Sequence, residues 1–247
     1  MSPLIRFLCV LLLGLLGAVA SAFATSAEND LRGWSVASGP RVLDGQWQLA
    51  WKQPQRASSQ VRLPYFWVDG TQLPWGEVGF GQVELRSRLL LPVDNDTPLS
   101  LRIDDVKSAA RVWVDDRLVV ERGLIGDAEH EQPRLVSMLV PLPEGRISVD
   151  VRIELSNHFH RLGGIEMPVV IGERAQLEAQ RASDRALSLL TLGGTLFMAL
   201  FMVALGRSNV RDVGGLEFSA LMLLAAMRIA STGELLDPLV EWPALWV

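Results

Sequence analysis

The segment VDVRIELSNHFHRLGG (Val149–Gly164) decides the fold of this 247-residue chain. Its first half alternates between apolar and charged side chains with a period of two residues. This alternation is typical of a strand that buries one face in a core. The second half begins at Asn157, a residue type that ends strands by hydrogen-bonding nearby backbone, and closes with a glycine pair suited to a turn. The segment therefore predicts a core strand followed by a short loop.

The same period recurs on the N-terminal side of this segment. It is clearest in Trp47–Trp51, Val83–Leu91 and Val112–Val114, and prolines and Gly145 separate the runs. Many short strands without a helical period between them favour antiparallel sheets that share one core. We expect residues 25–172 to form an all-β sandwich of the jelly-roll type.

The N-terminus is typical of a secretory signal peptide, expected over residues 1–24. Arg6 supplies a positive charge, Phe7–Val19 is apolar, and small residues follow at three possible cleavage points, after Ala20, Ala22 or Ala24. The only cysteine, Cys9, lies inside this segment. The exported domain is therefore expected to lack disulfides and thiol nucleophiles, so a well-packed core must hold it together.

The composition changes at Glu173. A run rich in Ala, Gln, Glu and Arg predicts a helix, and the next twenty residues carry no charge and are long enough to cross a bilayer. Arg207 and Arg211 lie in the short loop that follows, as expected for a cytoplasmic loop. The expected order is a connecting helix at 173–185, a transmembrane helix at 186–205, a cytoplasmic loop at 206–215, a second transmembrane helix at 216–230, and an outer loop with a truncated end at 231–247.

Charge and hydropathy exclude one class of partner and indicate another. The net charge is −5, and no run of lysine or arginine is present that would form a nucleic-acid-binding surface. The mean hydropathy is +0.24, high for a soluble protein of this size. The sequence predicts a membrane partner and no nucleic-acid partner, and homodimerisation stays open.

Two of the three histidines, His158 and His160, lie in the loop after the decisive strand. Histidines two residues apart on a strand project to the same side and hold zinc or copper if further ligands converge. No cysteine or further histidine cluster supports that reading, so neither a metal nor a cofactor is expected. The favoured interpretation is a strand end, and a ligand-facing loop is the alternative.

A second candidate region is the aromatic stretch LPYFWVDGTQLPWGEVGFG (Leu63–Gly81). Its rings either stack on sugars or cap the core, where Trp67 is expected. A jelly roll gathers alternate loops at one end, so this stretch can meet the histidine loop there. The candidate ligand-binding residues are Trp75, Glu77, Phe80, Asn157, His158, His160 and Arg161.

Enzymatic activity is not expected. The acidic pairs Asp104-Asp105 and Asp115-Asp116 occur where strands meet turns, the ordinary place for solvated aspartates. Adjacent residues on an extended chain point to opposite faces, whereas glycoside hydrolysis needs two acids that face one sugar. The motifs of serine hydrolases, P-loop proteins and dinucleotide-binding proteins do not occur.

Several segments together resemble one family, the bacterial seven-transmembrane receptors with diverse intracellular signalling modules. They are LDGQWQLAW (Leu43–Trp51), LPYFW (Leu63–Trp67), VWVDDRLV (Val112–Val119), SNHFHRLGG (Ser156–Gly164), VVIG (Val169–Gly172) and LEFSALMLLAAMRI (Leu216–Ile229). Two positions depart from the family pattern. Val83 stands where an aromatic residue is common, and Asp115-Asp116 replaces the usual Asn-Gly, which predicts a longer turn or one of another type.

The resemblance implies a bacterial inner-membrane receptor. Its periplasmic domain would be a non-catalytic, galactose-binding-like jelly roll that binds a ligand, either a small molecule or a carbohydrate. The output domain, often a diguanylate cyclase or a histidine kinase, would follow the seventh span and is not present in this chain. A membrane-tethered carbohydrate-binding or scaffolding module without a signalling role is the alternative.

Overall fold

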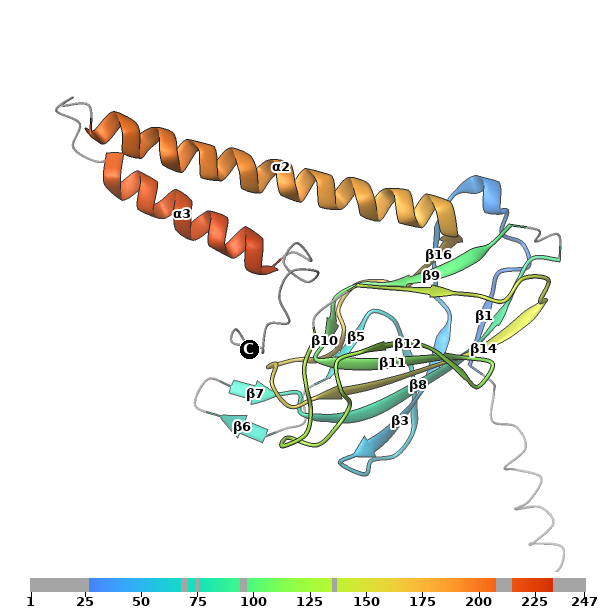
Figure 1. Cartoon of the computed structure of the whole chain (residues 1–247). Coiled ribbons are helices and arrows are strands. Elements are labelled where there is room, and N and C mark those ends of the chain that lie inside the picture. Colours follow the sequence, from blue (N-terminus) through green and yellow to red (C-terminus); the bar gives the residue numbers. More distant parts are fainter. Residues whose placement is uncertain are drawn as a thin grey trace, which may run out of the picture.

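The structure, a computed structural model, describes residues 27–67, 71–73, 76–93, 97–134, 137–207 and 215–232. It consists of packed β-sheets followed by two long helices (Figure 1). The expected signal peptide at 1–24, residues 208–214 of the expected cytoplasmic loop, and residues 233–247 of the outer end expected at 231–247 lie outside the described residues.

A seven-stranded sheet forms one layer of the sandwich. Its strand order is β12-β11-β14-β8-β3-β4, and β1 pairs in parallel with β8. The two central strands, β14 and β8, are antiparallel over their full lengths, from Ser148 opposite Leu90 to Asn157 opposite Gly81. The strands are β1 (Glu28–Asp30), β3 (Gln46–Gln53), β4 (Ser59–Arg62), β8 (Gly81–Leu90), β11 (Ala109–Val114), β12 (Arg117–Arg122) and β14 (Ser148–Asn157).

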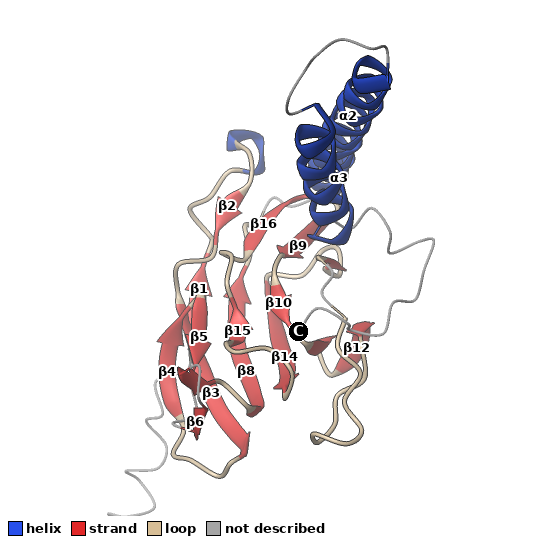
Figure 2. Cartoon of the chain, turned by 90° about the vertical axis from the view of Figure 1, so that its left-hand side faces the viewer, coloured by secondary structure: helices blue, strands red, loops and turns tan. Residues whose placement is uncertain are grey.

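The other strands form smaller sheets. A four-stranded sheet has the order β13-β9-β16-β2, a three-stranded sheet has the order β10-β15-β5, and β6 and β7 form a hairpin. Figure 2 shows the helices beside β9 and β16. The strands are β2 (Arg41–Val42), β5 (Tyr65–Trp67), β6 (Thr71–Leu73), β7 (Gly76–Val78), β9 (Leu99–Ile103), β10 (Val106–Lys107), β13 (Met138–Pro141), β15 (Gly163–Ile165) and β16 (Val170–Glu173), and a short 3-10 helix, η1, covers Val36–Ser38.

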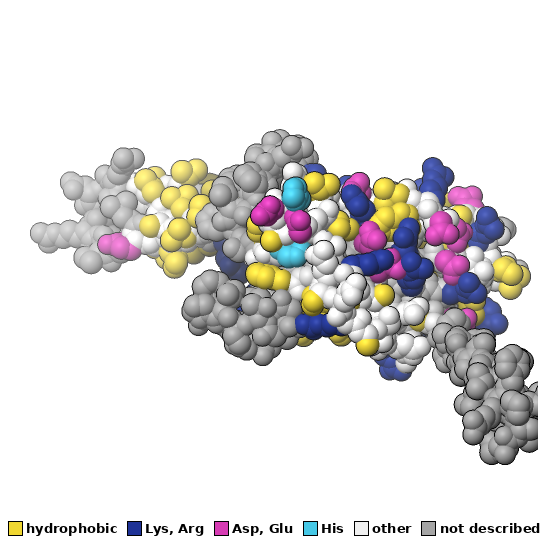
Figure 3. All heavy atoms as spheres, turned by 90° about the horizontal axis from the view of Figure 1, so that it is seen from below, with side chains coloured by type: hydrophobic (Ala, Val, Ile, Leu, Met, Phe, Trp, Pro, Cys, Tyr) yellow, Lys and Arg dark blue, Asp and Glu magenta, His cyan; other side chains and the backbone are white. Residues whose placement is uncertain are grey.

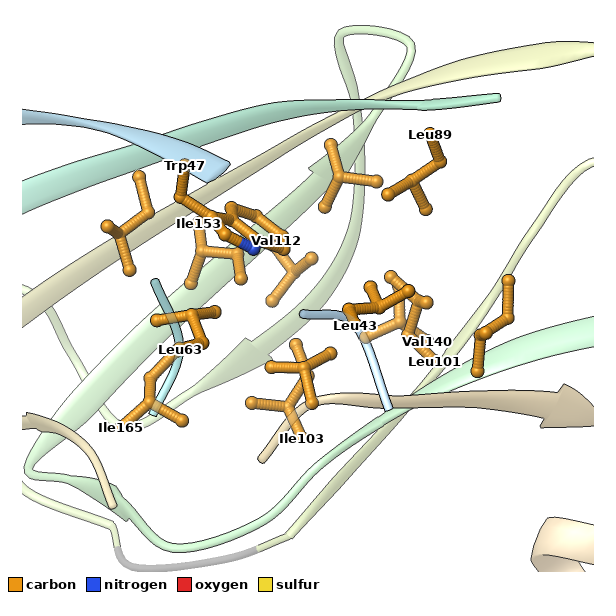
Figure 4. Packing of buried hydrophobic residues seen from close by; sticks show 14 of the residues in the cluster. Leu43, Trp47, Leu63, Leu89, Leu101, Ile103, Val112, Val140, Ile153 and Ile165 are labelled. Carbon is orange, nitrogen blue, oxygen red and sulfur yellow. The ribbon is translucent and has the colours of Figure 1, made fainter. Parts of the chain in front are cut away.

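One apolar core joins these sheets and confirms the period-two prediction. The alternating residues Val149, Val151, Ile153 and Leu155 of β14 are all buried. They pack with residues of the smaller sheets, among them Leu101, Ile103, Val140 and Ile165 (Figure 4). Burial of one such side chain contributes about 1.5–3 kcal/mol, so this cluster is the main source of the stability of the sandwich.

The hairpin between β11 and β12 differs from the sequence prediction. Val114 pairs with Arg117, so the loop has two residues, Asp115 and Asp116, with φ of 47° and 62°. Positive φ at both positions defines a type I′ turn, the same turn that Asn-Gly favours. The prediction of a longer or different turn was wrong, because aspartate also tolerates the left-handed region.

The two helices follow the last strand. Helix α2 (Arg174–Arg207) is one helix of 34 residues, so the expected connecting helix and the first expected span are continuous. Helix α3 (Gly215–Thr232) covers the second apolar segment. Ser219 of α3 donates to the carbonyl oxygen of Ala199 of α2 at 2.9 Å, and both residues are buried between the helices. The segment Arg174–Leu205 is the one helical segment among the described residues that is long and apolar enough to cross a membrane by length and composition.

Candidate functional site

Asn157, the last residue of β14, fixes the loop that follows it. Its side-chain amide donates to the carbonyl oxygens of His160 and Gly79 at 2.7 and 2.6 Å, and its side-chain oxygen accepts from the His160 amide at 2.9 Å. Asn157 is fully buried. These bonds confirm the prediction of a strand end, and they also bind the histidine loop to the segment in front of β8.

The two predicted loop regions therefore meet at one end of the sandwich. The Gly79 amide donates to the carbonyl oxygen of Arg161 at 2.6 Å. The ring centroids of Phe80 and His158 lie 6.3 Å apart, with the rings tilted by 43°. Trp75 lies outside the described residues, and Glu77 is described only as part of the β7 backbone.

Glycines allow this close approach. A Cβ atom on Gly79 would lie 2.1 Å from the carbonyl oxygen of Trp67, and a Cβ atom on Gly163 would lie 2.3 Å from the ring of the same tryptophan. Gly164 has a φ of 131°, which disfavours any residue with a side chain. Trp67 is buried as predicted. The glycine pair does not form the predicted turn but begins strand β15, because Gly163 and Gly164 pair with Trp67 and Phe66 of β5.

A buried pair of ionisable groups lies beside this loop. Nδ1 of His158 is 2.6 Å from Oε2 of Glu131. The Glu131 side chain is completely buried and the His158 side chain is 12% exposed. Burial raises the pKa of Glu131, and the hydrogen bond with His158 opposes this rise without cancelling it. The pair connects the segment between β12 and β13 to the end of β14.

Glu131 was not among the residues predicted from the sequence. It is 27 positions from His158, and no spacing or motif connects the two. The buried hydroxyl of Ser156 also interacts with the Glu131 carboxyl and, like His158, opposes the rise of its pKa. This is a polar site that only the folded chain assembles.

The other histidines make local contacts. Nδ1 of His160 lies 3.2 Å from the amide nitrogen and 3.0 Å from the carbonyl oxygen of Leu162. Nδ1 of His130 is 2.6 Å from Asp127, and both side chains are exposed. No group of three or more His, Cys, Asp or Glu side chains in the described ranges could hold a metal ion. Figure 3 shows histidine and carboxylate side chains close together at one end of the viewed face.

A second polar cluster lies on the outer face of the large sheet. Glu84 of β8 is buried and makes ion pairs with Arg86 and with Lys52, the latter at 3.1 Å. Burial alone would raise the pKa of Glu84, but the hydrogen bonds from Arg86 and Lys52 outweigh it, and the pKa lies below its usual range. The guanidinium of Arg152 stacks 4.1 Å from the ring centre of Trp113. Charges of both signs alternate on this face (Figure 3), a pattern that solvates a sheet and offers no single-sign surface to a partner.

Comparison with known proteins finds similar solved structures but no matching family. No protein-family model and no curated protein matches the chain. Solved structures with similarity to it include an FMN-binding β-glucuronidase from Facaelibacterium prausnitzii L2-6, at 19% identity and a TM-score of 0.43, over 53% of this chain and 22% of that one. A putative β-galactosidase from Bacteroides fragilis has 18% identity and a TM-score of 0.42, over 53% and 22%.

A β-glucuronidase from Ruminococcus gnavus, in complex with uronic isofagomine, has 12% identity and a TM-score of 0.40, over 53% of this chain and 27% of that one. The chain thus spans about a quarter or less of the length of these enzymes. Similarity at this level assigns neither a family nor an activity to the chain.

Proposed function

We propose that this chain is part of a membrane receptor of the bacterial inner membrane. Its sandwich is a periplasmic jelly roll that binds a polar ligand, and its helices carry the response across the membrane. The chain itself performs no chemical reaction in this proposal. The family resemblance of the sequence favours a carbohydrate as the ligand.

The continuity of α2 carries the proposal. Its first residue, Arg174, follows β16 without a linker, and the Arg174 amide donates to the carbonyl oxygen of Pro98 at 2.9 Å. Leu177 is fully buried against the sandwich, whereas apolar residues further along the helix, such as Leu190 and Leu200, are exposed. One rigid element therefore runs from the ligand-binding domain into a segment suited to lipid.

The loop cluster around Asn157 supports ligand binding. Phe80 offers an aromatic face, and His160 and Arg161 offer hydrogen-bonding groups at the surface of a rigid frame. An apolar face with a few fixed polar groups is the usual composition of a site for small polar molecules. A ligand could shift α2 only if it binds one arrangement of the sandwich and helix more tightly than another.

Hydrogen–deuterium exchange tests the proposal. The full chain in detergent is first screened on a glycan array, and exchange is then measured with and without the glycan that binds. A sensor shows slower exchange at residues 157–161 and a change at residues 174–185. Protection confined to the loops indicates a tethered carbohydrate-binding module, and a failure to bind any glycan excludes carbohydrate as the ligand.

Two matched variants locate the site. Phe80→Ala is expected to abolish glycan binding, because it removes the aromatic face beside His158. Trp113→Ala removes a half-buried ring from the outer sheet face and should leave binding unchanged. Loss of binding only in Trp113→Ala would move the site to that face.

A further inference from the structure

The direction of α2 determines which end of the sandwich faces the membrane. Three hydrogen bonds connect the first part of α2 to β9 and to the residue that precedes β13. Nε of Arg174 donates to the hydroxyl of Ser100 at 3.3 Å, and Nη1 of Arg102 donates to Oε1 of Gln180 at 3.4 Å. Nη2 of Arg181 donates to the carbonyl oxygen of Ser137 at 3.1 Å, next to Met138, which pairs with Ile103. The helix thus advances in the same direction as β9.

The end of β9 is also the end that holds the loop cluster. After Ile103 the chain passes through β10 and starts β11 at Ala109, which pairs with Ser156 beside Asn157. The 123–134 segment is attached at the same end, because the Arg134 amide donates to the carbonyl oxygen of Ser108 at 2.9 Å. The opposite end carries the 115–116 turn and the start of β14.

The lengths match. At about 1.5 Å per residue, α2 rises about 17 Å from Arg174 to Arg185. The four steps of β9 from Leu99 to Ile103 span about 13 Å at about 3.3 Å per residue, so the two lengths agree to within one turn of the helix. The uncharged part of α2 therefore begins level with the loop end of the sandwich, and it continues beyond that end (Figure 1).

Apolar side chains are exposed at this end. Phe159, between the two histidines of the loop, is 40% exposed, and Leu124 of the 123–134 segment is exposed to the same extent. Phe and Leu are among the side chains that membrane-surface proteins bury at the boundary between lipid headgroups and acyl chains.

We propose that the loop end of the sandwich rests on the lipid headgroup layer through Phe159 and Leu124. This inference rests on the proposed membrane span of α2. A ligand would then reach the cluster around Asn157 along the membrane surface, and the lipid headgroups form one side of its path.

Depth-dependent quenching tests the orientation. Single cysteines carrying an environment-sensitive fluorophore are placed in a Cys9→Ser background of the full chain, reconstituted in nanodiscs with spin-labelled lipids whose labels sit at the headgroup or deep in the acyl chains. Phe159→Cys and Leu124→Cys report on the loop end. Leu118→Cys, at 45% exposure, and Ile147→Cys are the matched exposed apolar positions of the opposite end. Leu200→Cys reports on the span.

The three groups of sites separate the outcomes. We expect headgroup labels to remove most of the fluorescence at 159 and 124 but little at 118 and 147, and deep labels to quench position 200. Equal, weak quenching at both ends with a quenched position 200 overturns the docking and leaves the span intact. An unquenched position 200 overturns the proposed membrane span itself. Two reporter sites at the loop end keep the test decisive if one variant does not fold.

Discussion

Asn157 donates to two carbonyl groups and accepts from one amide, so one side chain joins the end of β14 to a segment 78 residues earlier in the chain. Glu131 and His158 add a second connection beside it, and glycines 79 and 163 leave room for the ring and backbone of Trp67. At the scale of single residues, the loop end is thus held by a few buried polar contacts, and each can be removed separately.

Replacing Asn157 should destabilise the sandwich. Asn157→Ala leaves the carbonyl oxygen of Gly79 and the His160 amide without their buried partner, and the loss of buried hydrogen bonds of this kind costs about 1–3 kcal/mol per unsatisfied group. Asn157→Asp keeps the acceptor and removes both donated bonds, so it should also destabilise. Urea unfolding followed by tryptophan fluorescence measures both variants. Wild-type stability of Asn157→Ala would show that water replaces the amide at no cost.

The Glu131–His158 pair predicts a specific pH dependence. The pKa of Glu131 is raised by burial, so the folded protein keeps a proton that the unfolded chain releases near pH 4.5. The contribution of this group to stability is therefore lost as pH rises from about 4.5 through the raised pKa. Glu131→Gln removes this titration. The melting temperature of the variant should therefore rise relative to that of the wild type as pH increases through this window.

Glu129→Gln is the matched control for the loss of one carboxylate, since Glu129 lies two positions away and is exposed. Thermal melts at several pH values compare the three proteins. A difference between Glu131→Gln and wild type that stays constant with pH would contradict the raised pKa.

Elements of the sandwich differ in how far the sequence predicts them. The period-two runs gave the positions of β3, β8, β11 and β14, because alternating burial leaves a direct mark on the sequence. No sequence pattern predicts the parallel pairing of β1 with β8, the sheet order or the Glu131–His158 contact, because each depends on residues distant in the chain. The meeting of the Phe80 and Asn157 regions was expected from fold type, while the role of either as a ligand site stays a prediction.

The start of α2 is the element whose attachment to the sandwich can be weakened selectively. Leu177→Ala removes a fully buried side chain at the helix–sandwich contact and should cost about 2–5 kcal/mol. Leu187→Ala makes the same change at a position that is 65% exposed and should leave the stability of the sandwich unchanged. Faster hydrogen exchange of residues 174–185 in the first variant alone would confirm that this contact holds the helix. Similar exchange in both would show that other contacts hold it.

For the whole molecule, the two helices pack against each other but leave a large apolar surface uncovered. Leu190, Phe197 and Leu200 of α2 and Leu221 and Leu224 of α3 are exposed. Exposed apolar area of this extent marks a membrane or protein contact. The expected signal peptide, together with Arg207 and Arg211 between the two expected spans, predicts that the sandwich lies outside the cytoplasm.

Reporter fusions test this topology. Alkaline phosphatase, which is active only outside the cytoplasm, should work when fused after Gly172 and fail when fused after Asp212. A cytoplasmic reporter such as β-galactosidase at the same two sites is the control and should show the opposite pattern. Active phosphatase at Asp212 together with inactive phosphatase at Gly172 would invert the orientation and remove the basis of the receptor proposal.

The pairing of β16 with both β9 and β2 also determines when the sandwich can finish folding relative to the insertion of α2. Strand β2 is near the start of the described chain, and its partner β16 is the last strand before the helix. In the proposed topology, export delivers the chain from its N-terminus, so the early strand must wait unpaired until Glu173 has left the translocation channel. The next residues to arrive belong to α2. Completion of the sandwich and entry of the first helix into the bilayer are therefore successive steps of biogenesis, and the domain has to be kept from aggregating until then.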